Sequence, residues 1–275
     1  MSAEEKAEGG RRTREHIRYL PGLFPPLVSI IMATFNAAKV LERGIHSVLE
    51  QTYKNIEFII VDGGSTDATL DIIRKYDDRI DYWISEKDEG VYDAFNKGID
   101  IANGDWLFFL GADDSLANDS VLQRFFSKPI DSELLYGNVL WGEGGEIVAG
   151  EFFPEKFYSQ NICQQAIFYN KNLFERIGKF DLKYRLVADW VLNMKAFGLK
   201  TIKPVYFDTV VAVYSLGGMS TNVWDEEFLK NRERLYRKSF GIFAYLNFKV
   251  SSAIEKALIH SPKLRAVISF FTVRK

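Results

Sequence analysis

Between residues 27 and 127 the chain alternates buried-strand patterns with amphipathic-helix patterns, and this alternation limits the fold more than any other feature. Runs rich in apolar residues predict strands at 27–32, 56–61, 80–84 and 106–110. The segments between them repeat apolar residues at helical spacing, as Leu41, Ile45 and Val48 do. Strands that alternate with helices predict a parallel sheet with right-handed crossovers. The sequence therefore predicts an α/β fold, Rossmann-like, with a mostly parallel central sheet flanked by helices.

Three of the predicted strands end in short polar sequences. Thr34 and Asn36 follow the first strand, Asp62 follows the second, and Asp113 and Asp114 follow the strand at 106–110. Because parallel strands bring their carboxyl ends to one edge, where ligands bind, we expect one crevice to hold these side chains. Two adjacent carboxylates repel each other unless a cation lies beside them, and oxygen ligands suit Mg²⁺ or Mn²⁺. The pair favours a divalent metal with a bound phosphate; a polar loop that happens to contain two acids is the alternative.

Other classes of nucleotide-binding and catalytic site lack their residues in this sequence. A dinucleotide oxidoreductase would carry Gly-x-Gly-x-x-Gly after the first strand, but the next glycine is Gly44. No P-loop ending in Gly-Lys-Ser/Thr occurs either. Cys163 is the only cysteine and there are three histidines, which leaves little for a four-ligand zinc site or a histidine-based triad. We expect carboxylates, amides and a metal to do the chemistry.

Beyond residue 130 the strand–helix alternation gives way to a mixed pattern. Residues 134–141 and 146–153 predict a hairpin. Shorter elements are expected at 166–169, 171–177, 189–197 and 201–214. We divide the chain into a disordered N-terminal tail at 1–26, a catalytic domain at 27–225 and a basic, amphipathic, helical C-terminal extension at 226–275.

The C-terminal extension is the basic part of an otherwise acidic chain. Lys and Arg outnumber Asp and Glu by eleven to two from Phe228 to Lys275, although the whole chain carries a net charge of −2. Basic flanks around aromatic residues suit an anionic membrane surface, and no apolar run approaches the ~20 residues of a membrane-spanning helix. The alternative is a helical pair packed on the catalytic domain. The charged N-terminus has no signal-peptide pattern, and a single cysteine fits a reducing compartment, so we expect a cytoplasmic protein, peripheral on the inner face of the cell membrane if the tail binds lipid.

Five motifs occur in order, and together they resemble the family 2 glycosyltransferases of the GT-A fold. They lie at 28–36, 62–67, 88–98, 104–106 and 109–114. Within that family the chain is similar to a bacterial subgroup that builds surface polysaccharides and glycolipids. The sequences at 161–169 and 184–190 are similar to those of mycobacterial phenolic-glycolipid glycosyltransferases in particular. The resemblance covers residues 27–220.

The resemblance implies roles for individual residues. Nucleotide-sugar contacts are implied for a set of six residues: Thr34, Asn36, Asp62, Asp93, Asn96 and Asp113. The metal is implied at Asp114, with Asp113 beside it, and the catalytic base at Asp189. An acid between Ala188 and Trp190 is also expected to have a raised pKa, which suits a proton acceptor; a helix N-cap is the compatible alternative.

The acceptor side departs from the pattern of this subgroup. Gln164, Gln165 and Trp190 are implied on that side, but the subgroup often has His-Gln where this chain has Gln164-Gln165. A glutamine cannot accept a proton at neutral pH, so any acid–base or metal role of that histidine is missing here. Gln164 can still hydrogen-bond an acceptor or a phosphate.

We therefore predict an inverting, metal-dependent glycosyltransferase that moves a sugar from a nucleotide-diphosphate sugar to a glycan or lipid-linked acceptor. Mn²⁺ or Mg²⁺ is the expected cofactor, and no nucleic-acid partner is expected. Two alternatives remain: a catalytically inactive nucleotide-sugar-binding module, against which the intact Asp114 and Asp189 argue, and a nucleotidyltransferase. The latter would be expected to carry a Gly-rich loop with Arg or Lys near the first strand, and this chain has none there.

Overall fold

A computed structural model describes residues 6–15, 17, 19, 21–142, 144–148, 150–215 and 225–260, with the side chains of 251–260 left aside. Its strands are β1 (Ala7–Gly9), β2 (Val28–Thr34), β3 (Ile56–Asp62), β4 (Tyr82–Ser85), β5 (Trp106–Gly111), β6 (Ser115–Leu116), β7 (Leu134–Trp141), β8 (Ile147–Val148), β9 (Ile167–Asn170) and β10 (Val205–Tyr214). Its α-helices are α1 (Leu41–Leu49), α2 (Thr69–Lys75), α3 (Val91–Ile101), α4 (Val121–Phe126), α5 (Leu173–Ile177), α6 (Ala188–Gly198) and α7 (Glu226–His260). Three 3₁₀ turns complete it: η1 (Arg11–Thr13), η2 (Pro154–Tyr158) and η3 (Gln164–Ala166).

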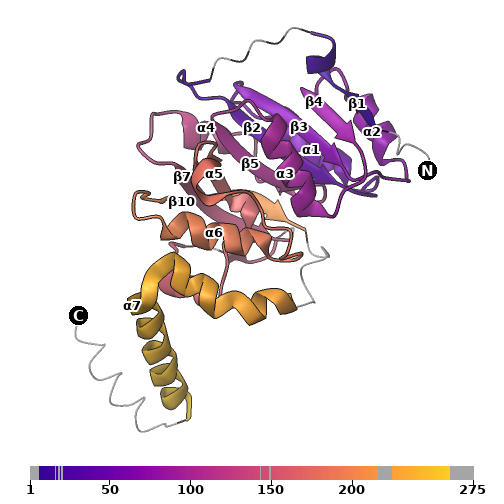
Figure 1. Ribbon diagram of the computed structural model, residues 1–275. Helices are drawn as coiled ribbons and strands as arrows, with labels where there is room; N and C mark the ends of the chain where they lie inside the picture. Colours follow the sequence, from indigo (N-terminus) through magenta and orange to yellow (C-terminus); the bar gives the residue numbers. More distant parts are fainter. Residues whose placement is uncertain are drawn as a thin grey trace.

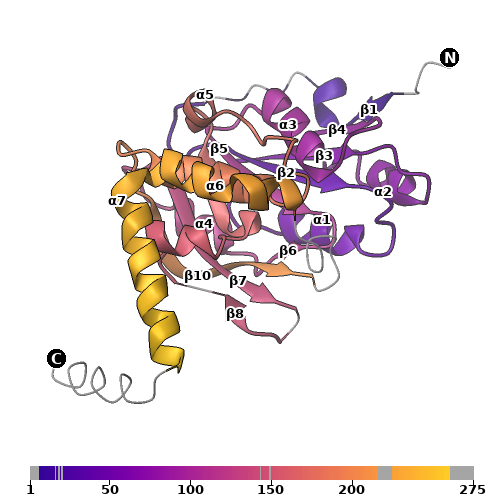
Figure 2. The same cartoon turned by 60° about the horizontal axis from the view of Figure 1, so that its bottom comes forward.

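One continuous sheet runs through the described chain in the order β1-β4-β3-β2-β5-β9-β7-β10-β6, with β8 paired to β7 (Figure 1). The strands β4, β3, β2 and β5 are parallel, which confirms the predicted α/β half. Beyond β5 the sheet is mixed, because β9 is antiparallel to both of its neighbours while β10 is parallel to β7. The predicted hairpin forms as β7 and β8, although β8 is only two residues long (Figure 2).

The sheet separates two apolar layers because successive side chains of a strand point to opposite faces. On β2, for example, Ile30 and Met32 pack with α1 and α4, whereas Ile31 packs with α3 and the layer that contains α5, α6 and α7. Helix α3 lies very close to the sheet at Gly98, where an added Cβ would come within 2.2 Å of Ile31 Cγ2. Any larger residue at position 98 would push α3 off β2.

The N-terminal region is not disordered throughout, so our expectation for residues 1–26 is wrong where the structure describes them. Residues Ala7–Gly9 form the edge strand β1, antiparallel to β4. The arginines that follow pair with acids of the sheet: Arg11 Nη2 lies 2.7 Å from Asp81 Oδ1, and Arg12 Nη1 lies 3.0 Å from Glu57 Oε1. Burial of these acids explains the order, because each carboxylate needs a cation or hydrogen-bond donors away from water.

Helix α7 begins against α6 and then bends away from the rest of the molecule (Figures 1 and 2). The bend is at Gly241, whose φ of 85° is not helical. No helix in the described part of the chain combines the length and the apolar character needed to cross a membrane. The last residues of the predicted extension, 261–275, lie outside the described residues.

Candidate active site

The sheet register brings the polar strand ends together. Thr34 at the end of β2 pairs with Asp62 at the end of β3, and Ala33 pairs with Gly111 at the end of β5. The side chain of Thr34 is buried, and its hydroxyl oxygen has no hydrogen-bond partner in the described structure. Because buried polar groups are nearly always paired, this hydroxyl is a candidate for contact with a ligand group.

Asp62 organises the turn that follows β3. It is buried, and its carboxylate accepts hydrogen bonds from the Ser65 amide at 3.0 Å, from the Ser65 hydroxyl at 2.5 Å and from the Ser85 hydroxyl at 2.6 Å. Asn36 has a φ of 47°, a conformation that Asn tolerates, and its Oδ1 accepts from the Thr66 amide at 2.9 Å. Asp62 and Asn36, which are both predicted to contact the nucleotide sugar, therefore shape this turn through the hydrogen bonds that they accept.

Asp88 lies beside the same turn, and the sequence did not single it out. A Cβ on Gly63 would come within 2.6 Å of Asp88 Oδ2, so the glycine makes room for this carboxylate. Burial raises the pKa of Asp88, and the nearby charges of Asp93 and Asp62 act in the same direction. The glycine directly after Asp62 was a usable signal for this close approach.

Asp114 is the buried member of the carboxylate pair. Its Oδ2 accepts from Gln165 Nε2 and its Oδ1 accepts from the Ser215 amide, each at 3.0 Å. Burial is the main cause that raises the pKa of Asp114 to about 7; the charge of Asp113 acts in the same direction, and the Ser215 amide and the charge of Arg43 act against it. Asp113 itself is half-buried, and its carbonyl accepts from the Arg43 guanidinium. A buried carboxylate whose negative form is disfavoured is ready to gain from a cation.

The carboxylates of Asp113 and Asp114 suit Mg²⁺ or Mn²⁺ better than a metal ion whose ligands all come from protein side chains. Within the described chain, no three His, Cys, Asp or Glu side chains come together as a metal-binding group. Such ions commonly use one or two carboxylates and complete their coordination with substrate phosphates and water. Asp114, with Asp113 next to it, can supply those carboxylates.

Asp189 lies in the first turn of α6 and is held by two side chains. Tyr92 on α3 donates to Oδ1 and Asn161 Nδ2 donates to Oδ2, each over 2.8 Å. Burial raises the pKa of Asp189 to about 6, and the hydrogen bonds from Tyr92, the Trp190 amide and Asn161 lower it in part. The prediction of a raised pKa is confirmed, and this pKa suits a group that accepts a proton near neutral pH.

Five consecutive residues connect the two acids. Asn161, at one end of the segment, bonds Asp189, and Gln165, at the other end, bonds Asp114. Cys163 lies between them, and burial together with the charges of Asp189 and Asp114 raises its pKa to about 12. Because a chain of five residues spans at most roughly 14 Å between its end Cα atoms, the two carboxylates bonded at its ends lie in one region of the molecule. We call residues 161–165 the bridging segment.

A buried amide network supports the bridging segment, and our sequence reasoning missed it. Asn193 is fully buried on α6; its Nδ2 donates to Asn161 Oδ1 at 2.9 Å and to the Ile162 carbonyl at 3.0 Å. The Tyr169 hydroxyl donates to Asn193 Oδ1 at 2.5 Å. An asparagine inside an apolar helix pattern was the available signal, because a buried amide needs partners for all of its groups.

Three predicted site residues are placed differently from the rest. Asn96 is used to anchor a loop, since its amide donates to the Phe180 carbonyl at 2.8 Å and accepts from the Phe180 amide at 3.0 Å. Asp93 lies at the start of α3 near Lys97, with 3.5 Å between Oδ2 and Nζ. Trp190 is buried against Phe228 of α7, and its Nε1 donates to the Phe157 carbonyl at 2.8 Å. The structure therefore places Trp190 in the core, away from an acceptor-side position.

Gln164 lies on the bridging segment, and its acceptor-side role stays a prediction. Its Oε1 is buried without a hydrogen-bond partner in the described structure, like the hydroxyl of Thr34. Two further atoms share this property, Arg11 Nε and the Tyr236 hydroxyl oxygen, and neither belongs to the predicted site. Gln164 thus has an acceptor atom available for a substrate hydroxyl.

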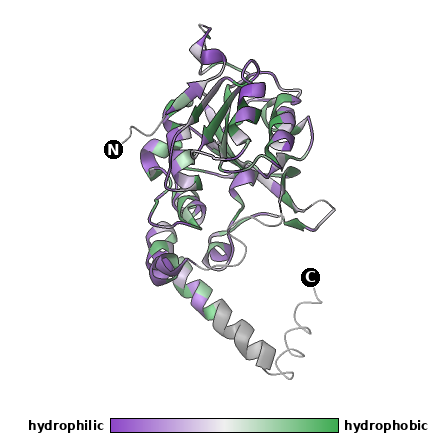
Figure 3. Ribbon diagram, turned by 90° about the vertical axis from the view of Figure 1, so that its right-hand side faces the viewer, coloured by the Kyte–Doolittle hydropathy of each residue, from purple (hydrophilic) through white to green (hydrophobic). Residues whose placement is uncertain are grey.

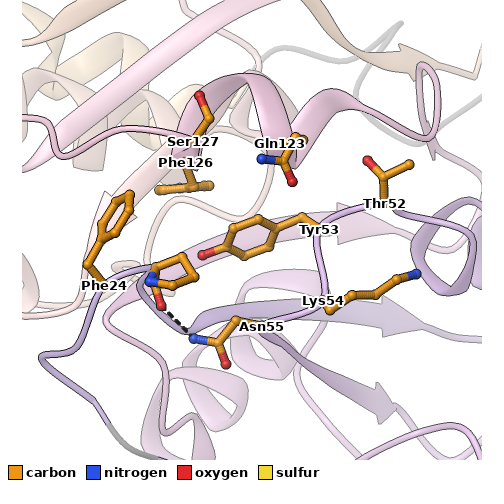
Figure 4. Close-up of a pocket in the computed structure, with 9 residues that line it drawn as sticks. Phe24, Thr52, Tyr53, Lys54, Asn55, Gln123, Phe126 and Ser127 are labelled. Carbon is orange, nitrogen blue, oxygen red and sulfur yellow. Dashed lines mark hydrogen bonds between the residues drawn. The ribbon is translucent and has the colours of Figure 1, made fainter.

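A surface hollow lies at the edge of the sheet opposite to these strand ends, and its lining residues are of a different kind. It lies near the amino-terminal ends of β2 and β3, as Figure 4 shows for Phe24, Tyr53 and Asn55. The hydrogen bond drawn there joins Asn55 Nδ2 to the Pro25 carbonyl at 2.7 Å. None of its lining residues is an acid, histidine or cysteine. The hollow therefore lacks the carboxylates that lie at the carboxyl edge of the sheet.

Comparison with known proteins points to one kind of enzyme. The sequence model of the family described as Glycosyl transferase family 2 matches residues 29–139. A protein of Mycobacterium bovis named PGL/p-HBAD biosynthesis glycosyltransferase is 38% identical over 253 residues, which cover 89% of this chain and 97% of that protein. An uncharacterized glycosyltransferase of Mycobacterium tuberculosis is 32% identical over 212 residues, 72% of this chain and 78% of its own length.

Two solved structures share the fold. The S. aureus TarS 1-349 complex with UDP-GlcNAc has a TM-score of 0.63 at 21% identity, over 78% of this chain and 66% of that one. The mannosyltransferase PcManGT from Pyrobaculum calidifontis, in complex with GDP-Man and Mn²⁺, has a TM-score of 0.58 at 18% identity, over 96% of this chain and 85% of that one. At these identities the likeness is one of fold alone.

Proposed function

Because the chain belongs to the family 2 glycosyltransferases and has their GT-A fold, we propose that it is an inverting, metal-dependent enzyme whose base is Asp189. The family membership makes it a glycosyltransferase, as predicted. The stereochemistry, the metal and the acceptor are our proposal. The contacts of Asp189 and Asp114 support the base and the metal, and the names of related proteins support the substrate classes.

The observation that carries the proposal is the bridging segment, which holds Asp189 at one end and Asp114 at the other. A transferase of this kind needs a proton acceptor on one side of the sugar and stabilisation of the leaving diphosphate on the other. The two acids differ in the partners that hold them: Asp189 is bonded by a tyrosine and an amide, whereas Asp114 is bonded by an amide and a backbone N–H. Their environments suit these two roles.

The nucleoside half of the donor is assigned to the edge formed by β2 and β3. The unpaired Thr34 hydroxyl offers a donor and an acceptor, and Asn36 lies on the turn beside it. Asp62 acts mainly by fixing that turn, and Asp88 is the carboxylate next to it. A nucleotide base and ribose present N–H and O–H groups, and such oxygens can accept hydrogen bonds from them.

In the transfer step, Asp189 accepts the proton of the acceptor hydroxyl while that oxygen attacks the anomeric carbon from the face opposite the nucleotide. The carbon–oxygen bond to the diphosphate breaks, and the sugar inverts its anomeric configuration. Asp114, with Asp113, would hold a divalent cation, which offsets the charge that develops on the diphosphate. Tyr92 and Asn161 keep Asp189 oriented, and Gln164 binds an acceptor hydroxyl through Oε1.

The substrates are proposed by class. The bound ligands of the fold relatives are a UDP sugar and a GDP sugar, which supports a nucleotide-diphosphate sugar as donor. The name of the 38% identical relative concerns glycolipid synthesis, which supports a lipid-linked or glycan acceptor. We propose that the reaction takes place on the cytoplasmic side of the membrane.

Incubation with a panel of UDP and GDP sugars, with Mn²⁺ or Mg²⁺, tests the function. We expect release of nucleoside diphosphate from one donor, and its dependence on added metal. Product configuration at the anomeric carbon, read by NMR, tests inversion. Release of pyrophosphate instead would identify a nucleotidyltransferase, and tight donor binding without any release, even with phenolic glycolipid acceptors, would identify an inactive binding module.

A further inference from the structure

The second half of α7 carries an apolar stripe that nothing in the described structure covers. After the bend at Gly241 the helix leaves the body of the protein, as Figure 3 shows. The stripe consists of Ile242, Phe243, Leu246 and Val250. Phe243 is 81% exposed and Val250 is 58% exposed, so both side chains leave most of their apolar surface in contact with solvent.

The stripe is distinct from the face that α7 uses to pack on the domain. At 3.6 residues per turn, the four stripe residues fall within an arc of about 100°. On the other side of the helix, Tyr245 is buried, and Phe248 stacks on Tyr158 of η2 with 3.8 Å between the ring centroids. Packing on the catalytic domain therefore accounts for one face of the helix and leaves the stripe unexplained.

A basic groove lies next to the stripe, at the bend of α7. Four of its six lining side chains are cations and one is an acid: Lys230, Arg234, Arg237, Lys238, Glu233 and Ile242. The last of these, Ile242, also begins the stripe. Apolar residues that adjoin a cationic groove form the pattern of a helix at a lipid–water interface, where side chains enter the acyl region and cations meet phosphate headgroups.

We propose that the stripe and the basic groove dock this protein on an anionic phospholipid bilayer. Charge complementarity selects this occupant: cations in the groove repel a second copy of the same groove, and an acidic membrane surface attracts them. The stripe adds apolar surface that the bilayer can bury, and this strengthens binding beyond the electrostatic attraction. No described helix crosses a membrane, so the contact is peripheral.

Docking through α7 has a consequence for the active site. The first half of α7 packs on α6, where the rings of Phe228 and Trp190 lie 4.9 Å apart. Trp190 is the residue after Asp189, so the helix that touches lipid is joined through one aromatic contact to the helix that carries the proposed base. A docked enzyme holds Asp189 at a set height above the membrane plane.

Vesicle pelleting tests the docking without any need for turnover. The full chain is spun with vesicles of phosphatidylcholine alone and of phosphatidylcholine with about 30% phosphatidylglycerol. We expect pelleting with the anionic vesicles at low salt and release at high salt, because screening shortens the attraction to a Debye length of ~3 Å at 1 M. Failure of the full chain to pellet with anionic vesicles at low salt overturns the proposal.

Matched variants locate the surface. Phe243→Ser/Leu246→Ser and Val250→Ser should lower the vesicle partition coefficient by roughly tenfold, whereas Leu23→Ser, which changes a residue as exposed as Val250, should not. Arg234→Glu/Lys238→Glu should abolish the preference for anionic lipid, whereas Arg74→Glu/Arg79→Glu, on and just after α2, should preserve it. Circular dichroism and thermal melting confirm that each variant is folded.

Two outcomes contradict the assignment. Stripe variants that pellet like the wild type would show that the stripe does not touch lipid. A wild type that sediments as a dimer without vesicles, with stripe variants that become monomers and no vesicle binding by either, would show that a second copy covers the stripe.

Discussion

The hydroxyl of Tyr92 on α3 donates a hydrogen bond to Oδ1 of Asp189 on α6 over 2.8 Å. Tyr92 is buried, and burial, with the charge of Asp189, raises its own pKa well above the usual range, so it stays a donor at every working pH. Helix α3 also begins beside the turn that is assigned to the nucleoside. The contact therefore joins the proposed nucleotide-sugar side of the site to the proposed base.

Asp189→Asn should lower kcat by about two orders of magnitude, the usual contribution of a general base, while the Kd of the nucleotide sugar stays within a few-fold of the wild type. The amide has nearly the same shape but cannot accept the proton. Steady-state kinetics and calorimetry with the identified donor measure the two effects. Lost donor binding with substantial turnover at saturation would make Asp189 a donor ligand instead.

Asn161→Ala should move the acid limb of the kcat–pH profile upward. Turnover requires ionised Asp189, so the rate falls as pH drops through its pKa of about 6. The Asn161 amide stabilises the charged form, so its removal raises that pKa, by about one unit for one hydrogen bond to a carboxylate. Asn172→Ala, at an exposed asparagine before α5, is the control and should leave the profile in place. An unshifted limb in Asn161→Ala would separate this amide from the base.

Asp114→Asn should remove the metal dependence of diphosphate binding and abolish transfer, because an amide lacks the negative charge that a hard cation prefers. Calorimetric titration of nucleoside diphosphate with and without Mn²⁺ measures this directly. Asp119→Asn is the control: Asp119 is exposed, it lies a short way further along the chain after β6, and its carbonyl rather than its carboxylate bonds Thr52. Near-wild-type turnover of Asp114→Asn at limiting Mn²⁺ would refute the metal assignment.

Thr34→Val should weaken nucleotide binding without weakening the fold. The Thr34 hydroxyl is buried and unpaired, so its replacement by a methyl group of similar shape costs no hydrogen bond in the free protein. If the hydroxyl binds the donor, affinity should fall by roughly three- to tenfold, the worth of about one hydrogen bond. Urea unfolding and nucleotide titration of one preparation give both numbers. Unchanged affinity would mean that the hydroxyl faces no ligand.

Arg12→Ala should destabilise the fold by about 3 kcal/mol, because it leaves a buried carboxylate without its cation. Its partner Glu57 is fully buried, although Ser29 and Asn103 also donate to it. Arg14→Ala is the matched control, since Arg14 is 52% exposed and pairs with Asp77 at the surface, where such pairs contribute less than about 1 kcal/mol. Equal losses in urea unfolding would mean that the buried pair contributes no more to stability than the surface pair.

The parallel half of the sheet was predictable because its signals are local. Apolar runs such as the one that ends at Leu110 can only be buried, and helical periodicity between them leaves little choice of topology. The order of the N-terminal arginines was not predictable, because their partners lie far along the chain: Arg12 meets Glu57, 45 residues later, and Arg11 meets Asp81, 70 residues later. Locally the segment looks like any charged tail.

The residues of the candidate site were likewise predictable only in part. The carboxylate pair at Asp113 and Asp114 could be found because it directly follows an apolar run, and Asp189 could be found through the resemblance to the family. The direction of a side chain could not: Trp190 follows Asp189 directly, yet the helix turns it into the core against Phe228. Asn96 likewise fits a ligand-binding motif, but the loop at Phe180 uses both of its amide groups. Only the packing of distant segments decides such cases.

The two donors that hold Asp114 come from late in the chain, since Gln165 follows it by 51 residues and Ser215 by 101. Contacts of such sequence separation close large loops and form after local structure, both in refolding and while a chain is being synthesised. The edge formed by Thr34 and Asp62 needs only residues 28–62 and their neighbours. A partly synthesised chain is therefore expected to form the proposed nucleoside edge before the proposed cation site.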